Sequence, residues 1–253
     1  MATKKKQIAA PPPSDSNAAA IVFNAPHQPL SCLPGLALPA TPSSDDEIVD
    51  AVRAAQARLG LTADGMCGPR TVRALLNEAF RALPVAPCAT PSGLSGILVA
   101  FGDPGLVHDK SHPARLHVTS SAYKSAIASV AFEGKPGELH ASLRREISGH
   151  FLASMSWIKA NLGWAPSRCD SFVPRTKNWS PDRRTNASTH SYAIAVDLDP
   201  LTNGRGDITP SIPQIVFLAM WAMGWMPGRF WGLRAGGNPK ESDPMHFQWA
   251  TNY

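Results

Sequence analysis

Ser188–Asp199 reads STHSYAIAVDLD, and the distant segment Asp243–His246 reads DPMH. Together they supply two histidines and well-placed carboxylates in a setting of small and β-branched residues. Imidazole and carboxylate are ligands that zinc accepts, and a further carboxylate beside such a site can act as a general base. We therefore expect the chain to be organised around bringing these two segments together.

The first segment predicts a short strand preceded by a bend. Small residues alternate with branched apolar residues along Ala193–Leu198, which is typical of a strand with one face in the core. Asp197 falls on the other face. His190 lies seven positions earlier, an odd separation that would place it on the wrong face of a straight strand. We therefore expect His190 to lie in a loop that folds back towards Asp197.

A metal site can be built from three of these residues. His190, Asp197 and His246 would offer two imidazoles and one carboxylate to Zn²⁺, with a fourth position open to water. Asp243 would then be free to accept the proton of that water. A hydrogen-bonded core pair is an equally good interpretation of His190 and Asp197 alone, so the metal hypothesis depends on the second segment.

A second pattern lies near the N-terminus. Ser44 or Asp45 can cap a helix whose apolar residues recur at helical spacing until Gly60. After a tight turn, Gly68 and Pro69 are a suitable opening for a second amphipathic helix. An ordinary helical hairpin without a ligand would show the same turn chemistry, so this pattern alone does not establish binding.

The rest of the chain indicates an α+β fold class with flanking helices and a small mixed or antiparallel sheet. Short strands are expected at Ile97–Phe101 and Leu116–Val118, and a long helix at Glu138–Asn161. Strands and helices are mixed rather than regularly alternating, which favours α+β.

Composition predicts four consecutive regions. Residues 1–44 are rich in Pro and Ala and are expected to form a flexible arm. Residues 45–82 would form the small helical domain, 83–96 a linker, and 97–253 the domain that carries the site.

Composition also narrows the partners. The net charge of +5 favours anionic polymers, such as nucleic acid or bacterial cell wall. No basic cluster with interleaved aromatics is present, so we expect no nucleic-acid partner. The sequence contains no apolar run long enough to span a membrane, so we expect no membrane span. It also lacks the apolar segment of a secretory signal, so we expect no signal peptide. The four cysteines lack the C-x-x-C spacing of zinc knuckles and of redox motifs, so we expect them to be reduced thiols.

The two patterns each resemble a known family. Val52–Leu75, as V-x-x-x-Q-x-x-L-G-L-T-A-D-G-x-x-G-P-x-T-x-x-A-L, resembles the small three-helix peptidoglycan-binding domain of cell-wall hydrolases. The S-x-H-x-x-A-x-A-x-D pattern of Ser188–Asp197, with Asp243–His246 and Phe230–Gly232, is similar to the LAS zinc metallopeptidases. That family includes D-alanyl-D-alanine carboxypeptidases and L-alanyl-D-glutamate endopeptidases.

The second resemblance implies a set of residue roles. Zinc would be bound by His190, Asp197 and His246, with Asp243 as the general base. Ala193 stands where the family usually has glycine, which adds a methyl group beside the metal loop. Arg175 is the best match for the family's substrate-binding arginine. The nearby pair Arg183 and Arg184 remains an alternative.

Together the resemblances imply a modular phage endolysin. It would hydrolyse peptidoglycan stem peptides, with the bond between L-Ala and D-Glu as the expected target. Such a monomeric enzyme would wait in the host cytoplasm until a holin-type permeabiliser releases it to the periplasm and cell wall. The alternatives are a D-Ala-D-Ala carboxypeptidase of wall maturation, and a wall-binding virion protein with a vestigial site.

Overall fold

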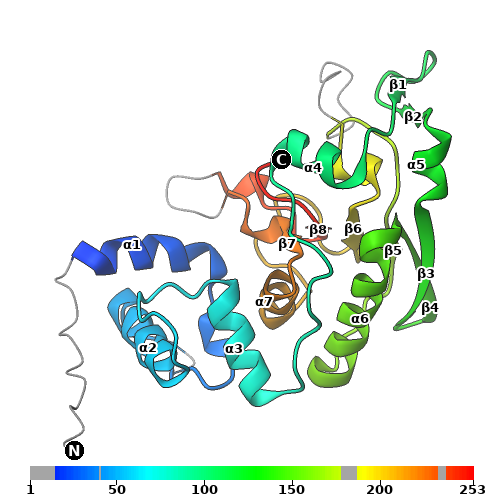
Figure 1. Ribbon diagram of the computed structural model, residues 1–253. Coiled ribbons are helices and arrows are strands. Elements are labelled where there is room, and N and C mark those ends of the chain that lie inside the picture. The colour runs from blue at the N-terminus through cyan, green and yellow to red at the C-terminus, as the bar shows by residue number, and fades with distance from the viewer. Residues whose placement is uncertain (1–14, 40, 178–186, 233–237) are drawn as a thin grey trace, which may run out of the picture.

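The computed structural model describes residues 15–39, 41–177, 187–232 and 238–253. These residues form an α+β fold in which a helical N-terminal part lies beside a larger part with small antiparallel sheets (Figure 1). No helix in the described ranges is long and apolar enough to cross a membrane.

The helical part consists of α1 (Asp15–Asn24), α2 (Asp45–Arg58) and α3 (Pro69–Ala79). The hydroxyl of Ser44 accepts the amide proton of Glu47 and caps α2, as the sequence predicts. Pro69 occupies the first turn of α3, where it forfeits no helical hydrogen bond. Both predicted helices of the hairpin are therefore present, with bounds close to those expected.

The expectation of a flexible arm is wrong for residues 15–39. This segment forms α1 and the short helical turns η1 (Ala25–His27) and η2 (Leu30–Cys32), and Leu30 is fully buried. The side chain of Asn24 bonds the backbone of Gly65 and Cys67 at 2.8 Å each. Burial of Leu30, Leu33 and Leu36 stabilises this segment. Its Pro-rich composition gives no sign of this ordered structure.

Two of the predicted elements in the larger part are also wrong. Residues 97–101 belong to the helix α4 (Gly93–Phe101), in which Ile97 and Phe101, four positions apart, are buried and Val99 is exposed. Residues 138–144 form the strand β4 (Gly137–Arg144), which pairs with β3 (Ile127–Gly134). The predicted long helix is therefore confined to α6 (Arg145–Leu162).

Shorter elements complete this side of the molecule. The strand expected at Leu116–Val118 is confirmed as β2, and it pairs with β1 (Leu106–His108). The short helix α5 (Ser121–Ser125) follows, and it leads into β3.

A four-stranded antiparallel sheet carries the two segments quoted at the outset. Its order is β5 (Cys169–Asp170), β6 (Ala195–Leu198), β8 (His246–Gln248) and β7 (Met226–Pro227). Asp197 of β6 lies directly opposite His246 of β8. Because opposed residues of paired strands point to the same face, this register brings both side chains together.

Helices and short turns surround this sheet. The helix α7 (Gln214–Ala222) packs on α6, and most of its apolar residues are buried in the hydrophobic core. The 3-10 turns η4 (Thr189–Tyr192), η5 (Gly228–Phe230) and η6 (Pro239–Glu241) lie before β6 and on either side of the 233–237 segment.

The two parts are joined by direct contacts as well as by the connecting chain. Arg73 of α3 donates to the carbonyl of Ala222 at 2.6 Å, and Gln214 donates to the carbonyl of His27 at 2.6 Å. The rings of His27 and Trp221 stack with centroids 4.4 Å apart. The helical part is therefore packed against α7.

Candidate metal site

His190, Asp197 and His246 meet at one buried point. Asp197 Oδ1 lies 3.1 Å from His190 Nε2 and 2.9 Å from His246 Nδ1, and the two ring nitrogens are 3.2 Å apart. Among the described residues this trio has the arrangement needed to hold a metal ion. The structure thus brings together all three residues that the sequence predicts as ligands.

The fold-back of His190 comes from the turn η4. The hydroxyl of Ser188 accepts the amide of His190, and the turn ends at Ala193, whose φ of 52° and ψ of 39° are left-handed. This conformation reverses the chain into β6 and lets His190 reach Asp197. Ala193 thus adopts the backbone geometry that glycine adopts most easily.

Hydrogen bonds to the outer nitrogens define how the two imidazoles face the centre. His190 Nδ1 lies 2.6 Å from the carbonyl of Ser171, which can only accept, so this nitrogen donates. Gln248 donates its amide to the carbonyl of Ala250, which turns its oxygen towards His246 Nε2 at 3.0 Å. In the neutral imidazoles, the lone pairs of His190 Nε2 and His246 Nδ1 therefore face Asp197.

The electrostatics at this point favour a bound positive charge. Burial opposes ionisation of Asp197, but when the imidazoles are protonated, the charge of His190 and the hydrogen bonds that both rings then donate hold the pKa of Asp197 well below its usual range. Burial would lower the pKa of His246, yet its hydrogen bond with Asp197 and the charges of Asp197 and Asp243 raise it. Two imidazole lone pairs and a carboxylate form a donor set that suits Zn²⁺.

Asp243 is held beside His246 by its backbone. Its amide donates to the carbonyl of Gly228 at 2.9 Å, and its carbonyl accepts the amide of His246 at 3.0 Å. A Cβ on Gly228 would lie 2.6 Å from the carbonyl of Asp243, so this close approach requires glycine. The two segments are thus fixed to each other by backbone contacts.

The carboxyl group of Asp243 has the properties of a base. Its Oδ1 is buried and has no hydrogen-bond partner among the described residues. Burial raises its pKa above the usual range, against the opposing charge of His246. A desolvated carboxylate with a raised pKa accepts a proton more readily than an ordinary carboxylate.

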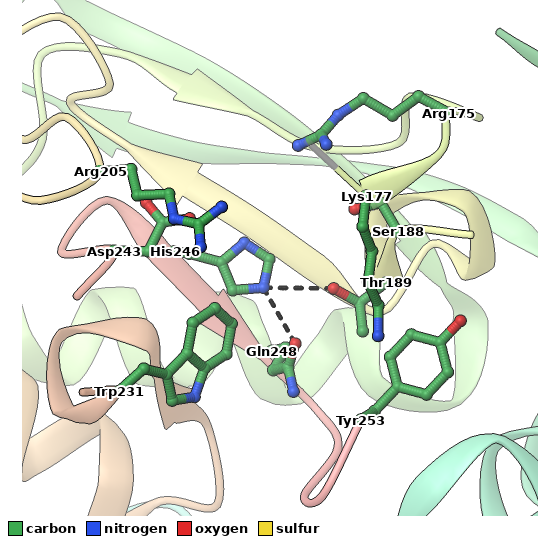
Figure 2. Close-up of a pocket in the computed structure, with 10 residues that line it drawn as sticks. All are labelled: Arg175, Lys177, Ser188, Thr189, Arg205, Trp231, Asp243, His246, Gln248 and Tyr253. Carbon is green, nitrogen blue, oxygen red and sulfur yellow. Dashed lines mark hydrogen bonds between the residues drawn. The ribbon is translucent and has the colours of Figure 1, made fainter. Parts of the chain in front are cut away.

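A pocket of about 170 Å³ opens over His246 and Asp243 (Figure 2). Arg175, the best match for the substrate-binding arginine of the second resemblance, lines this pocket. The alternative pair Arg183 and Arg184 lies outside the described residues. Burial lowers the pKa of Arg175, and the charges of Asp197 and Asp243 oppose that shift. Arg175 therefore places a guanidinium close to the carboxylates of the site.

Sequence reasoning missed four further residues that line this pocket, Lys177, Arg205, Gln248 and Tyr253. Trp231 also lines it and belongs to the Phe230–Gly232 stretch that the second resemblance includes. Figure 2 shows Arg205 beside Asp243, and Arg175 towards Lys177 and Ser188. The Trp231 ring lies 5.2 Å from that of His246, and Lys177 Nζ lies 3.8 Å from the centre of the Tyr253 ring. The positions of Lys177, two residues after Arg175, and Gln248, two residues after His246, were signals that could have indicated them.

Comparison with known proteins bears on the helical part. Residues 29–75 match a family described as a putative peptidoglycan binding domain. The chain therefore carries a peptidoglycan-binding domain in its N-terminal part, and peptidoglycan is its indicated partner. No curated protein and no solved structure matched the chain.

Proposed function

We propose that this protein is a zinc-dependent peptidase that hydrolyses peptide bonds in the stem peptides of bacterial peptidoglycan. The observation that carries the proposal is the convergence of two imidazole lone pairs and one carboxylate at a buried point, beside a second, unpartnered carboxylate. The peptidoglycan-binding domain supports the choice of substrate. The resemblance to LAS peptidases supports the choice of reaction.

The residues present fit a zinc ion. His190 Nε2, Asp197 Oδ1 and His246 Nδ1 would hold it, and the partners of the outer nitrogens orient both imidazoles. A bound zinc ion supplies Lewis acidity, which polarises a carbonyl and lowers the pKa of water. Three protein ligands leave a position open, which is typical of catalytic rather than structural zinc sites.

The protein side chains would carry the proton and position the substrate. Asp243 Oδ1 would accept a proton from the attacking water and later deliver it to the leaving amine, because its raised pKa suits both steps. Arg175 and Arg205, which both line the pocket (Figure 2), would bind carboxylates of the peptide or the oxyanion. Trp231 would form an apolar wall and limit access of water.

The proposed biological setting is lysis of the cell wall by an endolysin, with the bond between L-Ala and D-Glu as the target. In this setting the peptidoglycan-binding domain delivers the peptidase to its substrate. Release from the host cytoplasm by a holin-type partner, and action as a monomer, belong to the same proposal.

The direct test is digestion of purified sacculi with the zinc-loaded protein, followed by mass spectrometry of the soluble fragments. We expect new amine ends on D-Glu, and loss of the activity on chelation or in His246→Ala. Release of free D-alanine would instead identify a carboxypeptidase. Binding to sacculi without any hydrolysis by the wild type would contradict the peptidase and favour a wall-binding virion protein with a vestigial site.

A further inference from the structure

Three hollows adjoin one another between the metal site and the helical part. We name them the metal hollow, the middle hollow and the α3 hollow, and their volumes are about 170, 390 and 370 Å³. The metal hollow and the middle hollow share Trp231, Gln248 and Tyr253. The middle hollow and the α3 hollow share Met226 and Thr251. A path of shared walls therefore leads from the metal site to the peptidoglycan-binding domain.

The far end of this path belongs to both parts of the chain. Pro69 and Arg73 of α3 line the α3 hollow together with Trp221 of α7. The hydrogen bond from Arg73 to Ala222 and the packing of His27 on Trp221 hold this junction together. The distance from α3 to the metal site is thus set by packed contacts, and not by the length of a linker.

The chemistry changes along the path. The metal hollow carries the cationic groups Arg175, Lys177 and Arg205, which suit carboxylates. The α3 hollow is lined mainly by apolar groups and offers Trp221 as an aromatic surface. Peptidoglycan presents both matching features, because its stem peptides carry carboxylates and its sugar rings have apolar faces.

We propose that the three hollows form one groove that binds a single continuous segment of peptidoglycan, so that the binding domain and the metal site hold the same molecule. For its metal end, this inference rests on the proposed function. In this arrangement, α3 does more than bring the protein to the wall, since it sets the register of the segment relative to the metal site. The Met226–Thr251 seam is the position where the two halves of the groove meet.

The test is to obstruct the groove and measure affinity for purified sacculi by sedimentation, with a chelator present so that nothing is cut. Thr251→Trp would fill the seam, and Ala86→Trp would fill the α3 hollow from an exposed loop position. The matched control is Val99→Trp, which adds the same ring at an 89% exposed position outside the three hollows. A thermal melt of each variant shows that the fold is retained.

We expect both groove variants to weaken binding to sacculi by about tenfold or more and Val99→Trp to bind as the wild type does. Trp231→Ala, at the metal end, should also weaken binding, because one segment contacts both ends. Wild-type affinity in folded Ala86→Trp and Trp231→Ala would overturn the groove. Because the assay needs no hydrolysis, absence of peptidase activity would contradict the proposed function without affecting this result.

Discussion

The proposed role of Asp243 depends on a carboxyl oxygen that is buried without a hydrogen-bond partner in the described part of the chain. Replacing it with Asn keeps the size and the backbone contacts but removes the base. We expect Asp243→Asn to lose about a thousandfold in hydrolysis rate, the usual scale for general-base catalysis. Zinc content measured after dialysis should remain at one ion per chain.

The control for this variant is Asp50→Asn, because Asp50 lies on α2 with a 71% exposed side chain. It should hydrolyse stem peptides at the wild-type rate. A fully active Asp243→Asn would show that another group accepts the proton.

Replacing Ala193 with glycine changes the free energy of unfolding through several small contributions of opposite sign. Glycine would relieve a left-handed backbone that costs alanine about 1–2 kcal/mol. It would also lose a buried methyl worth about 0.8 kcal/mol and add about 0.4–1 kcal/mol of unfolded-state entropy. We therefore expect Ala193→Gly to change the free energy of unfolding, measured in urea, by less than about 1 kcal/mol.

Valine at the same position should destabilise by more than about 2 kcal/mol, because a β-branched residue is a poor fit to this conformation and to a fully buried site. Ala153→Val, on the exposed face of α6, is the matched control and should cost only a few tenths of a kcal/mol. Equal losses in the two valine variants would refute the role assigned to the left-handed turn.

Among the elements, η1 joins the helical part to the rest through an ionisable ring. Burial lowers the pKa of His27 to about 4, where it packs between Trp221 and Phe230. The unfolded chain therefore binds a proton between pH 6.5 and 4 that the folded chain excludes. Stability should fall as the pH drops through this window, by about 3 kcal/mol for a shift of this size.

His27→Phe should flatten this pH dependence in urea unfolding curves measured at several pH values. Phe23→Leu, which alters the same aromatic cluster without removing a titrating group, should lower stability and keep the slope. An unchanged slope in His27→Phe would show that another group controls the acid response.

The elements that could be predicted from sequence are those with strong local signals. The cap at Ser44 and the Gly68–Pro69 opening placed α2 and α3, since these residues satisfy helix ends by themselves. Residues 97–101 form a helix although their short apolar run fits either state, because burial of Ile97 and Phe101 decides between them. Residues 15–39 depend on contacts with Gly65 and Cys67, which no local pattern reveals.

Some residues of the candidate site could also be predicted from the sequence, and others could not. His190, Asp197 and His246 could be singled out as candidate ligands because zinc accepts few residue types, and the structure brings all three together. Arg205 could not, because it reaches the pocket from a loop whose path depends on packing against the 238–243 segment. Long-range contacts of this kind leave no spacing in the sequence.

For the whole molecule, zinc should act as a stabilising ligand. Zinc at about 1,000 times its dissociation constant would add about 4 kcal/mol to stability, because the three ligands come together only in the folded chain. We expect the melting temperature to rise by about 10 °C over that of the chelated protein in calorimetry.

His246→Ala should abolish this shift, whereas His140→Ala, which removes a mainly exposed imidazole from β4, should retain it. A shift of equal size in His246→Ala would place the bound zinc elsewhere.

The register of β6 and β8 decides whether a folded chain can form the candidate metal site. Asp197 and His246 are 49 residues apart, and they face one another only when the two strands pair as observed. A slip of one residue would turn His246 to the opposite face and leave two ligands on one side. With the proposed zinc site, only chains with the observed strand alignment would bind the metal, so the zinc content of a preparation would measure the fraction of correctly folded chains.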